Sequence, residues 1–171
     1  MNGIPEKINM FNVYRGGTKL IGISGEIKLP DFSSKAETIS GPGILGEYGA
    51  VTPGYFENME LEIPFSVLNE DLFSLMDPLA AVDLTLRASE QYSTVDGGTD
   101  FEGMRIVIRG KFSKLTAGKI QQGAASESGI TVALTYIYIE CDGKPQIELD
   151  KLNNVFKVRG VDVLQKARGL C

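Results

Sequence analysis

A glycine-bearing segment at residues 41–46, with the sequence GPGILG, offers the clearest match to a cofactor-binding motif. Its spacing is the G-x-G-x-x-G of dinucleotide-binding loops, whose small residues let the backbone approach a pyrophosphate. That chemistry also needs a buried strand before the loop and a helix after it. Residues 33–40 are polar and Gly49 follows closely, so a flexible or docking loop is the better interpretation. We expect no cofactor.

Two pairs of acids could also carry chemistry. Glu60 and Glu62 share one face of an alternating segment, as two catalytic carboxylates might be placed in a glycosidase. Exposed acids on a half-buried strand explain them more simply. Asp96 and Asp100 lie in a glycine-rich turn but lack the spaced ligands of a calcium loop, so turn formation is the better explanation.

The chain contains no histidine. Imidazole-activated serine or cysteine nucleophiles and histidine metal sites are therefore excluded. Cys141 and Cys171 are far apart and indicate neither a disulfide framework nor a zinc site, so we expect free thiols. The sequence predicts no catalytic, cofactor-binding or metal-binding residue, and no enzyme.

A basic stripe runs through Arg105, Arg109, Lys111 and Lys114 and could follow phosphates. The whole chain is acidic, however, with 17 basic and 22 acidic residues and a formal charge of -5. Proteins that grip nucleic acid are usually basic, so a DNA-binding module is disfavoured. We expect the stripe to pair with acids of a neighbouring strand or subunit. The charge says nothing against a surface past which DNA slides.

The first ten residues are polar and interrupted by Pro5, without the basic and apolar regions of a signal peptide. No apolar run approaches the roughly 18 residues of a membrane helix. We expect no membrane anchor and a cytosolic product that stays soluble until it assembles.

Period-two alternation of apolar and polar residues dominates the chain and predicts strands. The apolar positions of these segments are Ile21, Ile23, Ile27 and Leu29; Met59, Leu61, Ile63 and Phe65; Val82, Leu84 and Leu86; and Met104, Ile106, Ile108 and Phe112. Residues 130–139 are β-branched and aromatic on both parities, which favours a strand covered on both faces. Asp142-Gly143 predicts a tight turn, with residues 146–149 as the returning strand.

One helix is predicted from Asn69 to Asp77. Asn69 can cap it, acids follow in the first turn, and Pro78 ends it. Its apolar residues Leu72, Phe73, Leu75 and Met76 are expected to pack on a sheet. A short C-terminal helix could begin at Asp162 and end at Arg168 and Gly169. The fold class is therefore mainly β and antiparallel, with one packed helix, in a single domain spanning residues 1–171.

Three stretches are expected to be irregular: 31–53, 94–103 and 116–129. The first is rich in glycine and serine. A long loop in a compact domain usually has a function. We therefore expect residues 31–53 to be an assembly loop that contacts an adjacent subunit or ring.

The order of these features resembles the major tail tube proteins of contractile-tailed phages, a family shared with the tubes of R-type bacteriocins. Residues 11–29 resemble the first hairpin and residues 37–46 the glycine-bearing loop. The C-terminal half supplies the features Arg109-Gly110, Thr135-Tyr136, Asp142-Gly143, the run from Asp150 to Asn153, and Gly160-Val161-Asp162. The similarity covers nearly the whole chain, although residues 51–56 and 94–103 do not follow the pattern.

The resemblance implies a β-sandwich-like or barrel-like fold with one helix. It also implies hexameric rings whose sheets join into a continuous inner barrel, stacked as a tube inside a sheath. The implied partners are the chain itself, the tail sheath, tape measure, baseplate hub and tail terminator proteins, and DNA as a non-specific passing cargo. The implied location is the virion tail, assembled in the host bacterial cytoplasm.

Two alternatives remain open. The tube of a phage-derived bacteriocin or injection device would use the same fold without a DNA-filled head. A monomeric ligand-binding β-barrel would need an enclosed apolar cavity, usually with an aromatic lining. The chain has no tryptophan and long glycine-bearing loops, which disfavour the second alternative.

An inner wall that carries DNA should be net negative or nearly neutral, because each phosphate bound by Lys or Arg would hold the strand back. The candidate wall residues lie on the polar parity of the alternating strands. They are Glu60, Glu62, Asp83, Thr85 and Ser89.

Overall fold

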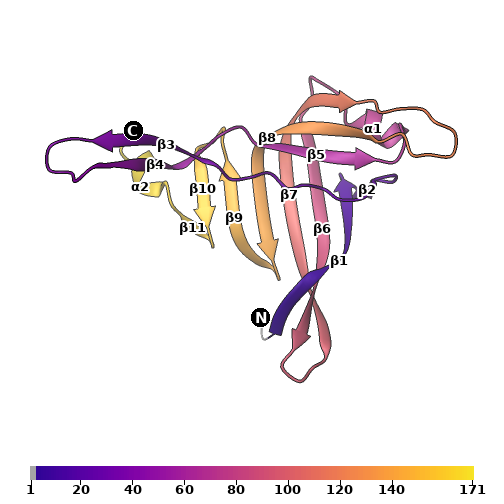
Figure 1. Cartoon of the computed structure of the whole chain (residues 1–171), viewed down its shortest axis with the longest axis horizontal. Coiled ribbons are helices and arrows are strands. Elements are labelled where there is room, and N and C mark those ends of the chain that lie inside the picture. Colours follow the sequence, from indigo (N-terminus) through magenta and orange to yellow (C-terminus); the bar gives the residue numbers. More distant parts are fainter. Residues whose placement is uncertain (1–2) are drawn as a thin grey trace.

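A computed structural model describes residues 3–171; Met1 and Asn2, at the start of the polar N-terminal stretch, lie outside the described residues. Most of the described chain belongs to one antiparallel sheet with the strand order β11-β10-β9-β8-β7-β6-β1-β2 (Figure 1). Its strands are β1 (Gly3–Arg15), β2 (Thr18–Lys19), β6 (Val82–Thr94), β7 (Thr99–Thr116), β8 (Ser128–Cys141), β9 (Lys144–Asp150), β10 (Val155–Val158) and β11 (Val161–Asp162). The expected mainly β, antiparallel fold is confirmed.

The long strands β7 and β8 continue beyond the body of the sheet and carry a second layer. The second half of β8 pairs with β9, whereas its first half pairs with β5 (Glu60–Phe65). The β7–β8 register shifts between Arg109 and Gly110 and again between Phe112 and Lys114. Such bulges bend strands. β5 therefore crosses the top of Figure 1 while β6 and β7 run down it.

The core lies between these two layers. Leu61, Ile63 and Phe65 of β5 are fully buried in one cluster with Leu84 of β6 and Ile108 of β7. The predicted alternation is thus confirmed in β5, β6 and β7. In β8 one face is buried and the other is only partly covered, so the expected burial of both faces is half correct.

The predicted helix is α1 (Glu70–Ser74), and the Asn69 side chain caps it by accepting a hydrogen bond from the Leu72 backbone N–H at 2.9 Å. Leu72 and Leu75 are buried, as expected. Phe73 is 50% exposed, so its expected place in the core is wrong. Residues three apart lie on the same side of a helix, so Leu72 and Leu75 both face the core. Phe73 lies on another side of this short helix and faces solvent.

The segment at residues 31–53 is not structureless. It contains the strand β3 (Ser34–Ser40) and most of β4 (Glu47–Phe56), which form a separate two-stranded sheet. This hairpin, the arm, extends from one end of the molecule in Figure 1, and the 117–127 loop extends from the other end. Almost every arm residue is exposed, so the sequence carries no burial pattern there.

Two other expectations need correction. Residues 21–29 do not form a strand but make isolated bridges, Ile23 to Phe65 and Lys28 to Glu62. Gly22 and Gly25 adopt positive φ values of 90° and 64°, which interrupt the extended chain. Residues 99–103 are not a turn but the start of β7, which pairs with β6 through a turn at 95–98. The predicted Asp142-Gly143 turn and the irregular link before β8 are confirmed.

The C-terminal segment packs against the root of the arm. Phe56 of β4 contacts the Phe156 ring edge-on at 5.2 Å between ring centroids, and Phe32 packs on Phe56 at 5.6 Å. A short helix, α2 (Gln165–Arg168), follows β11 as predicted, although none of its residues is buried. Cys141 and Cys171 are both free thiols, as expected.

Candidate channel-lining surface and assembly edges

The main sheet has one face buried under β5 and α1 and one polar face. The polar face carries Asp83, Thr85, Arg87 and Ser89 of β6, because Val82, Leu84 and Leu86 occupy the buried parity. Their cross-strand neighbours on β7 are Arg109, Val107, Arg105 and Gly103. We call this surface the polar sheet face. It holds three of the candidate wall residues.

Arg105 lies in a three-part cluster at the centre of the polar sheet face. Its guanidinium pairs with Glu140 at 2.9 Å and lies over the Tyr138 ring, 5.6 Å from the ring centroid. The Tyr138 hydroxyl donates a hydrogen bond to the same Glu140 carboxylate at 2.8 Å. The Tyr138 hydrogen bond, followed by that of Arg105, lowers the pKa of Glu140.

A second cluster lies one step along the sheet. Arg109 pairs with Asp83 at 3.1 Å, and its guanidinium lies 4.5 Å from the centroid of the Tyr136 ring. The Tyr136 hydroxyl donates to Glu148 at 3.1 Å, and Lys157 lies 4.0 Å from Glu148. Burial and then the charge of Glu148 raise the pKa of Tyr136 to about 12. The expected pairing of Arg105 and Arg109 with acids of adjacent strands is confirmed.

Arg87 differs from these two arginines. It stands directly opposite Arg105 in the antiparallel register, and within residues 3–171 it forms no ion pair. The buried hydroxyl of Ser89 likewise finds no hydrogen-bond partner in that part of the chain. The polar sheet face is therefore mainly charge-paired, and its one arginine without an ion pair in this span, Arg87, still lies close enough to Glu140 for its charge to help lower the pKa of that carboxyl.

Glu60 and Glu62 occupy a different surface. Their parity on β5 is exposed, while Leu61 and Ile63 face the core shared with the main sheet. Because β5 packs face to face on that sheet, its acids point away from the side that carries Asp83. The structure therefore does not bring the five candidate wall residues together.

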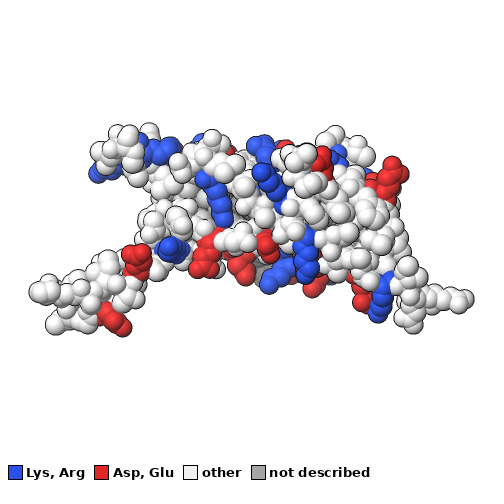
Figure 2. Space-filling view, turned by 90° about the horizontal axis from the view of Figure 1, so that it is seen from above, with Lys and Arg blue, Asp and Glu red and all other residues white. Residues whose placement is uncertain are grey.

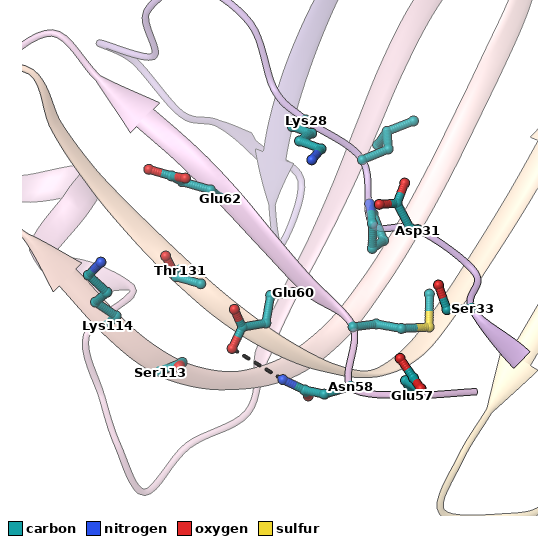
Figure 3. Close-up of a pocket in the computed structure, with 13 residues that line it drawn as sticks. Lys28, Asp31, Ser33, Glu57, Asn58, Glu60, Glu62, Ser113, Lys114 and Thr131 are labelled. Atoms are coloured by element: carbon teal, nitrogen blue, oxygen red, sulfur yellow. Dashed lines mark hydrogen bonds between the residues drawn. The ribbon is translucent and has the colours of Figure 1, made fainter. Parts of the chain in front are cut away.

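The β5 acids border a surface pocket of about 470 Å³ (Figure 3). Lys28, Lys114 and Thr131 also line it, and Asn58 donates a hydrogen bond to Glu60 at 3.3 Å. The pocket is open and mixes both signs of charge. Glu60 and Glu62 lie here on the exposed parity of β5, as acids of a half-buried strand do.

The other motifs have structural explanations. Residues 41–46 connect two strands at the tip of the arm, so the helix that a dinucleotide-binding loop needs does not follow them. Asp100 accepts a hydrogen bond from Tyr92 in the β6–β7 hairpin. Among residues 3–171, no three Cys, Asp or Glu side chains are grouped as a metal site requires. No helix in the same span is long and apolar enough to cross a membrane.

Comparison with known proteins decides the family. Residues 5–170 match the family described as phage tail tube protein FII. The chain belongs to this tail tube family. It is 28% identical over 167 residues to the tail tube protein of Escherichia phage P2, covering 96% of each chain. It is also 28% identical over 158 residues to the major tail tube protein of Serratia phage KSP20, covering 92% of this chain and 90% of the relative.

Membership of the tail tube family makes the chain a structural tube subunit and a component of the virion tail. The resemblance drawn from the order of its sequence features is confirmed. Apart from its short pairing with β2 at Tyr14 and Arg15, β1 has no partner on its outer side among residues 3–171. Ile4 and Met10 on this edge are 72% and 67% exposed.

The tube subunit has a second open border at the other end of the sheet. There β10 covers only Ile147–Asp150 of β9, and β11 pairs with β10 at only two positions. An open strand edge with exposed apolar side chains favours pairing with another chain. The two borders are formed by different strands, β1 with β2 at one end and β9, β10 and β11 at the other.

Proposed function

We propose that the subunit polymerises as stacked hexameric rings that form the inner tube of a contractile phage tail and the channel for DNA ejection. The unpaired β1 edge is the observation that carries this proposal. Joining it to the β9–β10 border of a neighbour extends the sheet, and repetition of that head-to-tail contact closes a ring. Closure into a barrel leaves no free edge.

The polar sheet face should line the channel. A ring has more room outside than inside, and the opposite face of the sheet is thickened by β5, α1 and residues 20–32. Stacked layers add about 10 Å each, so the thick side fits on the outside of a narrow tube. Asp83, Thr85 and Ser89 then face the channel, and Glu60 and Glu62 face outward.

The arm and the 117–127 loop are suited to contacts beyond the ring. Figure 2 shows both projecting at opposite ends of the molecule, and their outermost parts carry no charged side chains. The arm exposes Leu45 fully at its tip, along with Tyr48 and Val51. An extended apolar hairpin in water is stabilised by covering it. A neighbouring subunit or ring supplies that cover in this proposal.

The subunit acts without catalysis. Its partners are further copies of itself, the tail sheath, tape measure, baseplate hub and tail terminator proteins, and DNA in transit. Assembly takes place in the host bacterial cytoplasm.

The test is an edge-blocked variant. Purified protein should form rings or open tubes in negative-stain microscopy. Ile4→Lys with Met10→Lys places two charges on the β1 edge and should leave a folded, unassembled protein, because edge lysines oppose strand addition. Leu79→Lys changes a residue that is 94% exposed and off the sheet edge, and should still form tubes.

Normal tubes from the edge-blocked variant would refute closure through β1. Circular dichroism of the soluble variant must retain the β-type spectrum, which excludes misfolding as the reason for lost assembly.

A further inference from the structure

The two paired arginines of the polar sheet face are held by their neighbours in a way that limits what they can bind. Each guanidinium stacks on a tyrosine ring and also meets a carboxylate, as described for Arg105 with Glu140 and Arg109 with Asp83. Arg105 and Arg109 are four positions apart on β7, or about 13 Å along the strand. Without the acids they would form a basic line together with Arg87.

The acids come from the strands on either side of β7. Asp83 belongs to β6 and stands opposite Arg109, whereas Glu140 belongs to β8 and stands opposite Arg105. The tyrosines hold this arrangement, since Tyr138 orients the Glu140 carboxylate through its hydroxyl. A guanidinium already engaged by a carboxylate keeps its charge, but the pair is neutral as a whole and fewer N–H groups are free for a phosphate.

We infer that Asp83 and Glu140 mask Arg109 and Arg105, so that the polar sheet face does not hold DNA although it is rich in arginine. This inference rests on the proposed function, since its biological meaning assumes that this face lines the channel. An acidic channel wall is already expected to repel DNA, and the ion pairs add a second reason why this face does not bind it. The wall is kept from binding by paired charges, and Asp83 and Glu140 are the residues that set this property.

The masks can be removed with little damage to the fold. The Arg109–Asp83 pair is exposed, and such pairs contribute little to stability. The Arg105–Glu140 pair is part-buried, but a glutamine at position 140 keeps an oxygen that can accept the Tyr138 hydrogen bond. The variant Asp83→Asn with Glu140→Gln keeps the side-chain shapes and frees both arginines. Its matched control, Glu60→Gln with Glu62→Gln, changes the net charge equally on the opposite surface.

The measurement is fluorescence anisotropy of a labelled DNA duplex of about 20 base pairs, a length that covers several phosphates of each strand. The unassembled fraction from size-exclusion chromatography is used. At about 50 mM salt the unmasked variant should bind about tenfold more tightly than the wild type or the control. Two new phosphate contacts should steepen the log–log salt dependence by about 2, so most of the gain should be lost by about 200 mM salt. Adding Arg105→Gln and Arg109→Gln should remove the gain.

Equal binding by the unmasked variant and the wild type would overturn the inference, and so would an equal gain in the control variant. Assembled particles separate this result from the proposed function. If the unmasked variant binds the duplex but ejects DNA at the normal rate, the masks are real and the polar sheet face does not line the channel. Slower ejection by the unmasked variant supports both the masking of the arginines and the position of the polar sheet face at the channel.

Discussion

At the scale of single residues, Gly110 shows how tightly the bend between β7 and β8 is built. A Cβ added at Gly110 would lie 2.1 Å from the backbone oxygen of Ala133. Gly110→Ala should therefore lower the free energy of unfolding by about 1–3 kcal/mol, the usual cost of overpacking. Gly103→Ala is the control on the same strand, because nothing lies within 4 Å of its added Cβ. Urea denaturation of soluble protein measures both, and equal losses would show that the close approach does not matter.

Neighbouring helix residues should respond very differently to truncation. Leu72 is 0% exposed and Phe73 is 50% exposed. Leu72→Ala should cost about 2–5 kcal/mol of unfolding free energy, whereas Phe73→Ala in the unassembled protein should cost under about 1 kcal/mol. Thermal or urea unfolding gives the comparison. A larger loss at Phe73 would place its side chain in the core, against the structure.

The C-terminal helix should detach in acid. Arg168, by hydrogen bonding, and then the Leu164 backbone N–H lower the pKa of Asp162. A carboxyl with a lowered folded-state pKa stabilises the fold above its ordinary pKa of about 4, and that contribution is lost as the pH falls through the lowered value. NMR signals of residues 165–171 should therefore sharpen into the unfolded range at low pH. Asp162→Asn should show the same loosening at neutral pH, and a helix indifferent to both would refute the role of this pair.

At the scale of elements, what the sequence predicted follows burial. β5, β6 and β7 each place one parity in the core, so period-two alternation identified them. Asn69 marked the start of α1 correctly because an N-cap acts locally, whereas the helix ends at Ser74 with Leu75 as its C-cap and does not continue to Pro78 as predicted. The strands of the arm were not predicted because nearly all of their residues are exposed. Neither strand buries alternate side chains, so the sequence there shows no period-two pattern. The segment at 21–29 was wrongly predicted as a strand because its residue types alternate, whereas Gly22 and Gly25 interrupt the extended backbone and Ile21 is exposed.

The candidate wall was only partly predictable for a related reason. Parity placed Glu60, Glu62, Asp83, Thr85 and Ser89 on the polar faces of their strands, although the Ser89 hydroxyl is buried, and parity does not tell which layer a strand joins. The bulges near Gly110 bend β7 and β8 and set β5 on the opposite side. The tyrosine–arginine–carboxylate clusters were missed because their partners meet only through the register of β6, β7 and β8. The sequence did offer one clue to these clusters, because Tyr136 and Tyr138 stand at alternate positions and therefore share one face of β8.

The arm gives the clearest prediction for an element. Replacing residues 35–55 with a short glycine–serine link should leave the core intact, because the arm forms its own two-stranded sheet. The variant should keep its β-type circular dichroism and fail to form tubes. Normal tubes from this variant would show that the arm is not an assembly element.

At the scale of the whole molecule, a single subunit leaves strand edges open at both borders of the sheet. Its two projections, the arm and the 117–127 loop, expose apolar side chains to solvent. Within residues 3–171, the outer side of β1 is paired only at Tyr14 and Arg15, and the arm and the 117–127 loop extend from opposite ends of the molecule (Figure 1). Membership of the tail tube family fits a subunit whose edges are completed by other copies. We expect the sheet to continue from subunit to subunit with its polar face toward the channel.

A helical reconstruction of the assembled tube by electron cryomicroscopy tests that expectation most directly. We expect hexameric rings in which β1 of one subunit is hydrogen-bonded to the β9–β10 border of the next. We also expect Asp83, Thr85 and Arg105 at the channel, with Glu60 and Glu62 outside. A channel lined by the β5 surface, or a β1 edge left uncovered in the tube, would contradict this arrangement.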